Sequence, residues 1–255
     1  MFESPYTYQT KLITILQRNG RKAMNKRYPF VCALMTVLLC LLHTGPVHAA
    51  VQAIPQSISE VDVLIDVGHG GIDGGTSHGD LLEKHLNLLV AKQLYEKLRA
   101  SGLQVALNRT TDYALSDDND WLGSRSRHLR DLAQRKLLID ALKPKLTVSL
   151  HTNWARHSSA RGPGLLYQFN QPSYIAAHLL AGRLNELYGT KEVPYVGKTF
   201  YLLKRTQTPA VIIEMGYISN ESDRAMLTRT EGQKKIAEAI ASAILDYLLV
   251  FYVDH

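Results

Sequence analysis

The fold of this 255-residue chain is decided by the stretch VLIDVGHGGIDGG, residues 63–75. Its apolar, β-branched half predicts a buried strand, and its glycine-rich half predicts a turn that presents His69 at the end of that strand. Two further apolar runs end in the same way, since residues 146–150 lead to His151 and residues 210–213 lead to Glu214. The carboxyl ends of strands in an open α/β sheet are where functional groups collect, so we expect these three side chains to meet.

Strands and amphipathic helices alternate from residue 61 onward. A helix is predicted wherever apolar residues recur at steps of three and four, as in the helix that begins at Glu83 and ends at Ser101-Gly102. The strands are apolar on both faces, which is typical of a sheet covered on both sides. The sequence therefore predicts a single α/β domain with a mostly parallel central sheet flanked by helices. We expect strands at 61–67, 103–108, 145–150, 165–169, 199–203 and 209–213, and helices from Glu83, after Ser124, at 173–187 and from Glu231.

The helix after Ser124 is predicted to have one apolar and one basic face, with Ser124 as its cap. The apolar face, expected in the core, comprises Leu129, Leu132, Ala133, Leu137 and Ala141. The basic face, expected in solvent or against an anionic polymer, comprises Arg125, Arg127, Arg130, Arg135 and Lys136. The preceding polar segment 109–123 contains four aspartates, which favour a solvated loop over a calcium site because their spacing is not that of an EF-hand.

The first 49 residues predict a secretory signal. Basic residues precede an apolar run at 30–42, and the small residues up to Ala49 suit a signal peptidase. The run is shorter than the ~20 residues that span a bilayer comfortably, so a permanent N-terminal membrane segment attached through residues 30–42 is the alternative. We expect residues 1–49 to direct export, residues 50–60 to form a linker, and residues 61–250 to form the folded domain.

Cysteine chemistry is excluded from the exported domain. Cys32 and Cys40 both lie in the apolar run, so cleavage after Ala49 leaves no cysteine. Disulfide bonds, thiolate metal ligands and a cysteine nucleophile are excluded together.

The positive charge of the chain belongs mostly to its N-terminal segment. Residues 1–50 contain six basic residues and one acidic residue, which leaves 29 − 6 = 23 basic and 23 − 1 = 22 acidic residues in the remainder. The chain after residue 50 therefore has a net charge of +1, which gives no reason to expect a nucleic-acid partner.

Two histidines and a carboxylate at strand ends predict a zinc site with one position left for water. Glu83 and Glu214 compete for the carboxylate position. Glu83 follows the glycine-rich turn that begins at His69, so we assign Glu83 as a ligand with His69 and His151, and Glu214 as the general base. Taken singly, Glu83 could complement the positive end of its helix, and either histidine could be hydrogen-bonded in the interior.

At these residues the chain resembles the zinc-dependent N-acetylmuramoyl-L-alanine amidases, over about residues 61 to 249. The motifs that carry the resemblance are DVGHGGIDGG at 66–75, LEK at 82–84, RTTD at 109–112, SLHTN at 149–153 and IEMGYISN at 213–220. The resemblance implies one Zn²⁺ held by His69, Glu83 and His151, with Glu214 as the catalytic glutamate. It also implies hydrolysis of the peptidoglycan amide bond between the lactyl group of N-acetylmuramic acid and L-alanine.

The compact plan of signal and catalytic domain resembles the sporulation amidases, which remove peptides from cortex peptidoglycan so that muramic δ-lactam forms. It implies action outside the cytoplasm, at the cell wall or in the spore intermembrane space, and leaves an accessory activating protein unidentified. The alternatives are a vegetative autolysin of the same chemistry, a zinc peptidase acting on the stem peptide, and a peptidoglycan-binding module without activity.

Overall fold

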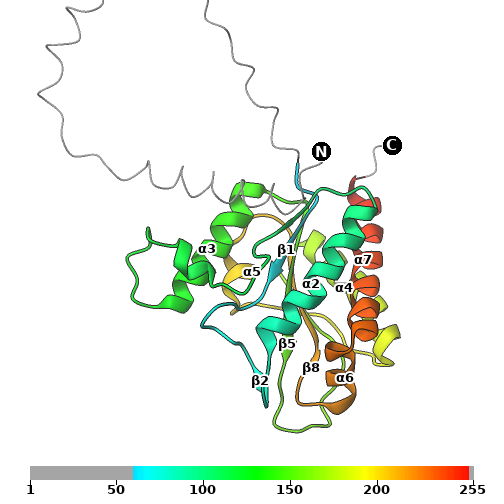
Figure 1. Cartoon of the computed structure of the whole chain (residues 1–255). Helices are drawn as coiled ribbons and strands as arrows, with labels where there is room; N and C mark the ends of the chain where they lie inside the picture. Colours follow the sequence, from blue (N-terminus) through cyan, green and yellow to red (C-terminus); the bar gives the residue numbers. More distant parts are fainter. Residues whose placement is uncertain (1–59, 253–255) are drawn as a thin grey trace, which may run out of the picture.

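A computed structural model describes residues 60–252 of the chain (Figure 1). The predicted signal at 1–49, its apolar run at 30–42 and the linker up to residue 59 lie outside the described residues. Within residues 60–252, every helix is too short or too polar to cross a bilayer.

Six strands form the central sheet in the order β4-β1-β5-β8-β6-β7. The pairs β4–β1, β1–β5, β5–β8 and β6–β7 are parallel, and the pair β6–β8 is the one antiparallel pair of this sheet. The predicted single α/β domain with a mostly parallel sheet is therefore confirmed. The strands are β1 Val63–Val67, β4 Val105–Leu107, β5 Leu146–Asn153, β6 Gly164–Tyr167, β7 Tyr195–Val196 and β8 Ala210–Tyr217, with a separate hairpin of β2 Ser77–His78 and β3 Leu81–Leu82.

Helices cover both faces of the sheet (Figure 1). They are α2 Glu83–Ala100, α3 Arg127–Leu142, α4 Gln171–Tyr188, α5 Tyr201–Arg205, α6 Glu221–Thr228 and α7 Thr230–Tyr252, with a 3₁₀ turn at Leu115–Asp118. Val63, Ile65 and Val67 of β1 pack into the core shared with α2, α4 and α7. Leu64 between them faces α3 and α5. Because successive side chains of a strand point to opposite faces, burial on both sides explains why β1 is apolar throughout.

β5 and β8 continue past the points where the sequence predicts them to end. His151 and Glu214 are register partners within the parallel β5–β8 pair, and the ladder shifts only between His151 and Asn153. Polar side chains therefore do not end these strands, because the backbone hydrogen bonds continue beyond them. The consequence is that His151 and Glu214 stand side by side on one face of the sheet.

The strand predicted at 199–203 is wrong. Residues 201–205 form the short helix α5, and the strand of this region is β7 at Tyr195–Val196. Leu202 and Leu203 are buried in two different core clusters. These residues are apolar because α5 packs against the sheet. Helix α6 was not predicted; Asn220 caps it by accepting a hydrogen bond from the backbone N–H of Asp223.

The predicted faces of α3 are wrong in part: Ala133 is buried and Arg125 is exposed as expected, but other positions differ. Ser126, not Ser124, caps the helix, by accepting a hydrogen bond from Leu129 N at 3.2 Å. Leu129 and Leu137 are 37% and 41% exposed, whereas Arg135 is only 3% exposed. Arg135 turns inward because the buried carboxylate of Asp66, on β1, pairs with it at 2.8 Å.

Candidate functional site

His69 occupies the turn in which β1 leaves the sheet. Its φ of 59° lies in the left-handed region, which is uncommon for a residue with a side chain and typical of strained functional positions. Its Nδ1 lies 3.1 Å from Asp73 Oδ2, and its Nε2 lies 3.2 Å from Glu83 Oε1. Burial lowers the pKa of His69, but the contacts with Asp73 and Glu83 outweigh it and raise the pKa to about 9.

Glu83 is the first residue of α2, and its carboxylate is buried at the strand ends. Its Oε1 accepts hydrogen bonds from Thr152 N at 3.0 Å and Asn87 Nδ2 at 3.2 Å, and its Oε2 accepts one from Thr76 N at 2.8 Å. Burial alone would raise the pKa of Glu83, but its contacts with His151 and His69 hold it well below its usual value. The carboxylate is therefore an anion in a fixed orientation.

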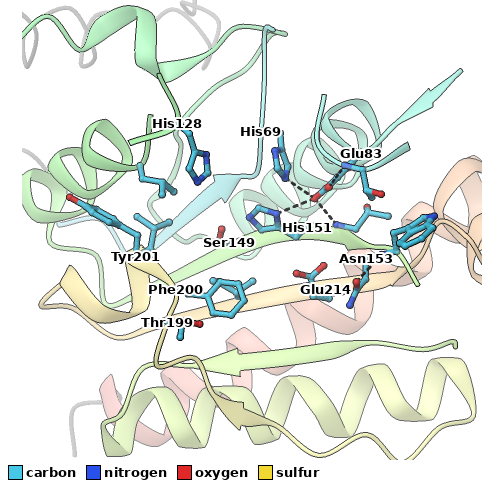
Figure 2. A pocket seen from close by; sticks show the side chains of 16 residues that line it. His69, Glu83, His128, Ser149, His151, Asn153, Thr199, Phe200, Tyr201 and Glu214 are labelled. Carbon is cyan, nitrogen blue, oxygen red and sulfur yellow. Dashed lines mark hydrogen bonds and ion pairs between the residues drawn. The ribbon is translucent and has the colours of Figure 1, made fainter. Parts of the chain in front are cut away.

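The donor atoms of His69, Glu83 and His151 converge at one point. They lie within 4.8 Å of one another, and Glu83 Oε1 is 3.0 Å from His151 Nδ1 as well as 3.2 Å from His69 Nε2. Figure 2 shows the two imidazoles and the carboxylate turned toward each other. The planes of the two imidazole rings lie at 82° to each other. Two imidazole nitrogens and a carboxylate oxygen are a donor set that suits zinc. Among residues 60–252, this group could hold a metal ion.

Two glycines make room for these side chains. A Cβ on Gly68 would lie 2.4 Å from the His151 ring, and a Cβ on Gly75 would lie 2.5 Å from Glu83 Oε2. Gly75 also has a φ of 68°, a backbone conformation that a side chain disfavours. The glycines of the opening motif thus serve close approach of the backbone to the candidate ligands.

Glu214 faces the same cavity from β8, beside His151 (Figure 2). Burial raises the pKa of its carboxyl, the nearby His151 lowers it, and the negative charge of Glu83 raises it further, so the net change is upward. A carboxyl with a raised pKa next to a candidate metal site is suited to accept and return a proton.

The cavity in front of these groups has a volume of about 520 Å³, which is within the usual range for ligand sites. His69, Glu83, His151 and Glu214 lie along its polar side. Apolar and aromatic side chains also line the cavity, namely Leu132 of α3, Phe200 just before α5, Tyr201 and Leu202 of α5, and Ile212 of β8. Trp154, which follows β5 and is 52% exposed, also lines the cavity.

Several polar residues around the site were not predicted from the sequence. Asp73 contacts His69, while Asn87 and Thr152 hydrogen-bond to Glu83 and to each other. Asp73 lies in the same glycine-rich turn as His69, which was a usable signal. The sequence signal for Asn87 was weaker: Asn87 lies four residues after Glu83, on the same face of the helix.

Three further polar residues lie in or near the site. Ser149 lines the cavity, but its Oγ donates to Asp66 Oδ2 at 2.5 Å. His85 is directed to Asp112 at 3.4 Å, away from the candidate metal site. His128 is exposed and also lines the cavity.

Comparison with known proteins follows the same motifs. A family model described as N-acetylmuramoyl-L-alanine amidase matches residues 63–246. The germination-specific N-acetylmuramoyl-L-alanine amidase of Bacillus subtilis is 30% identical over 187 residues, which cover 72% of this chain and 78% of that protein. The N-acetylmuramoyl-L-alanine amidase LytC of the same organism is 29% identical over 188 residues, which cover 72% of this chain and 35% of LytC.

Solved structures share both fold and sequence with the chain. The CwlD amidase from Clostridioides difficile, solved in complex with the GerS lipoprotein, is 31% identical with a TM-score of 0.69, covering 74% of this chain and 99% of that one. The amidase AmiC2 of Nostoc punctiforme is 26% identical with a TM-score of 0.62, covering 75% and 98%. The match of the family model extends over most of the chain and includes every motif of the candidate site. The chain therefore belongs to the N-acetylmuramoyl-L-alanine amidase family, and it is an amidase that acts on peptidoglycan.

Proposed function

We propose that this amidase depends on one zinc ion held by His69, Glu83 and His151, and that Glu214 is its catalytic acid and base. The bond cleaved is the amide between the lactyl group of N-acetylmuramic acid and L-alanine. The observation that carries the proposal is the convergence of three donor atoms within 4.8 Å, from three separate elements, beside Glu214.

The residues fit a catalytic zinc site. His69, Glu83 and His151 would hold the ion with three protein donors, the number typical of zinc hydrolases, which keep one position for water. A bound zinc ion would supply Lewis acidity toward water and toward the substrate carbonyl. Asp73 at Nδ1 would keep the Nε2 of His69 available as the metal donor, since a partner on one ring nitrogen determines the tautomer.

Glu214 is positioned to move the proton. It lies beside His151, so it can take a proton from the attacking water and deliver it to the departing nitrogen of L-alanine. Its raised pKa supports both roles, because a group that must hold and release a proton works best near the operating pH. A serine nucleophile has no support, because Ser149 Oγ is engaged by Asp66.

The test is product analysis combined with metal analysis. The purified chain is incubated with sacculi, and mass spectrometry identifies the products; we expect intact stem peptides with an L-alanine amino terminus. Glu214→Gln should reduce the rate by about 10²–10⁴-fold, the usual contribution of a general base, while zinc content is retained. His69→Ala should lose both zinc and activity.

Two control variants match these substitutions. Glu221 and His157 are exposed and lie outside the cavity, so Glu221→Gln and His157→Ala should behave like the parent. Equal zinc content in His69→Ala and the parent contradicts the ligand assignment. Products cleaved within the stem peptide would instead identify a zinc peptidase.

We further propose a role in spore cortex maturation, leading to muramic δ-lactam. The support is the likeness to the germination-specific amidase of Bacillus subtilis and to CwlD of Clostridioides difficile. We expect faster removal of peptides from cortex peptidoglycan than from vegetative sacculi in parallel digests. Preference for vegetative sacculi would favour an autolysin.

An extracytoplasmic location and an accessory protein complete the proposal. The CwlD amidase was solved with the GerS lipoprotein, which supports a protein partner for this chain too. Activity and zinc content are measured for the purified chain alone and together with a lipoprotein from the organism that encodes this chain. Full zinc loading and activity without any partner would argue against an accessory protein.

A further inference from the structure

The turn that carries His69 has backbone carbonyls that no strand can satisfy. β1 ends at Val67, and the next two carbonyls, of Gly68 and His69, lie beyond the sheet. Buried carbonyl groups need donors, because an unpaired one costs free energy comparable to a lost hydrogen bond. The carbonyls of Val67, Gly68 and His69 accept hydrogen bonds from the guanidinium groups of Arg109 and Arg135. We call these two residues the arginine clamp.

Arg135 reaches the turn from α3. Its Nη1 donates to Val67 O at 2.7 Å, and its Nη2 donates to His69 O at 3.0 Å. Its charge is balanced by Asp66 at 2.8 Å and by Asp131 at 2.5 Å. A rigid, planar guanidinium thus bridges two carbonyls on either side of Gly68, one of which belongs to His69 itself.

Arg109 reaches the turn from the segment after β4, and it is fully buried. Its Nε donates to Val67 O at 3.3 Å, and its Nη2 donates to Gly68 O at 3.0 Å and to Lys84 O at 2.8 Å. Lys84 follows Glu83 at the start of α2. One guanidinium therefore ties the turn of His69 to the helix end that carries Glu83.

Arg109 does more than fill space in the interior, because a buried charged side chain is costly. Its hydrogen-bond acceptors are all backbone carbonyls, of Val67, Gly68, Lys84 and Thr111. Placing a charged group in the interior is costly unless it is paired, and carbonyl dipoles compensate only in part. Such a cost is typical of positions where geometry matters for function.

We propose that Arg109 and Arg135 are positioning residues that hold His69 and Glu83 in ligand geometry before any metal binds. The inference rests on the proposed function, because it takes His69 and Glu83 as zinc ligands. The left-handed conformation of His69 is costly for a residue with a side chain and persists only where the surroundings enforce it. The clamp supplies that enforcement from two sides.

The test replaces each clamp residue by lysine, which keeps the charge but loses the planar fork that serves two carbonyls at once. The variants are Arg109→Lys and Arg135→Lys, with Arg183→Lys as the matched control because Arg183 is exposed and pairs with Asp246 on the surface, away from the turn. Zinc affinity of the folded full chain is measured by competition with a chelator. The Co²⁺-substituted proteins give a visible spectrum that reports ligand geometry.

We expect zinc binding about 10–100-fold weaker in both clamp variants, the usual effect of losing a group that orients a metal ligand. The Co²⁺ spectrum should change, while Arg183→Lys matches the parent in both measurements. A purely structural role would lower the unfolding temperature but leave the zinc affinity and Co²⁺ spectrum of the folded protein unchanged. That result would overturn the inference.

Two additions keep the test decisive. If Arg135→Lys does not fold, the substitute variant is Asp131→Asn, which removes one partner of Arg135 but keeps the guanidinium. Asp131→Asn should weaken zinc binding, although less than Arg109→Lys does. A zinc affinity equal to that of the parent would count against the clamp. A parent that binds no zinc, or binds it independently of His69, refutes the proposed function. Zinc binding that depends on His69 but not on the two arginines refutes only the clamp.

Discussion

Replacement of Gly68 by alanine tests whether the backbone of the first turn was shaped around His151. A Cβ at residue 68 would lie 2.4 Å from Cε1 of the imidazole and 2.7 Å from both ring nitrogens. Ordinary contact begins near 3.4 Å, so the ring has to withdraw by about 1 Å. Gly68 does not have the positive φ of its neighbours, so alanine introduces the clash without backbone strain.

A displacement of this size is large for a metal ligand, whose distance must hold to about ±0.2 Å. We expect Gly68→Ala to bind zinc more weakly and to hydrolyse sacculi about 10²-fold more slowly, as 1 Å misplacements can do. Overpacking should also cost about 1–3 kcal/mol in the free energy of unfolding.

The assay combines chelator competition, the initial rate of peptide release and unfolding in urea. Gly182→Ala is the matched control, because Gly182 lies in α4 with nothing within 4 Å of its added Cβ. That variant should keep zinc and activity and gain about 0.5–1 kcal/mol from better helix propensity. Zinc affinity and rate in Gly68→Ala equal to those of Gly182→Ala would refute the reasoning.

Three further substitutions test the surroundings of the site. Ser149→Ala should retain hydrolysis in a sacculus assay and cost about 1–3 kcal/mol in unfolding experiments, because Asp66 loses its hydroxyl donor; loss of turnover with zinc still bound would revive a serine mechanism. Asp66→Asn should destabilise the fold by about 3–5 kcal/mol at neutral pH, since Arg135 loses a buried partner. Burial raises the pKa of Asp66, but Arg135, Ser149 and His151 together outweigh burial and hold the pKa below its usual value. The stabilisation is therefore present above the unfolded pKa and is lost as the pH falls through the folded pKa; a gap between parent and variant that widens in acid would contradict it. Asp73→Asn should weaken zinc binding about 10–100-fold by releasing His69 Nδ1, and unchanged affinity in a chelator titration would show that Asp73 does not orient the ring.

Local patterns predicted much of the architecture. β1, α2 and β5 begin close to their expected positions, because apolar periodicity and glycine turns depend on neighbouring residues. The misplaced strand at 199–203 shows the limit of this reasoning. An apolar run of that length suits a strand or a short buried helix equally, and only the packing under the sheet decided for α5.

The face of α3 shows the same limit more clearly. Hydrophobicity alone placed Leu129 and Leu137 in the core and Arg135 in solvent. Arg135 is buried because its partner Asp66 lies 69 residues away in sequence, a distance over which periodicity carries no information. A buried aspartate on a central strand was the one local sign that a cation had to come from elsewhere.

By itself, the sequence predicted the fold class and the candidate site of this protein: an α/β domain whose strands bring His69, His151 and Glu214 to one edge, with Glu83 after the first turn. Side-chain type and turn glycines are local properties, so they can be read in order along the chain. Only the tertiary structure decided how those groups are held, by the buried guanidiniums of Arg109 and Arg135 behind the turn. Those supports depend on contacts between distant segments, which exist only once the chain has folded.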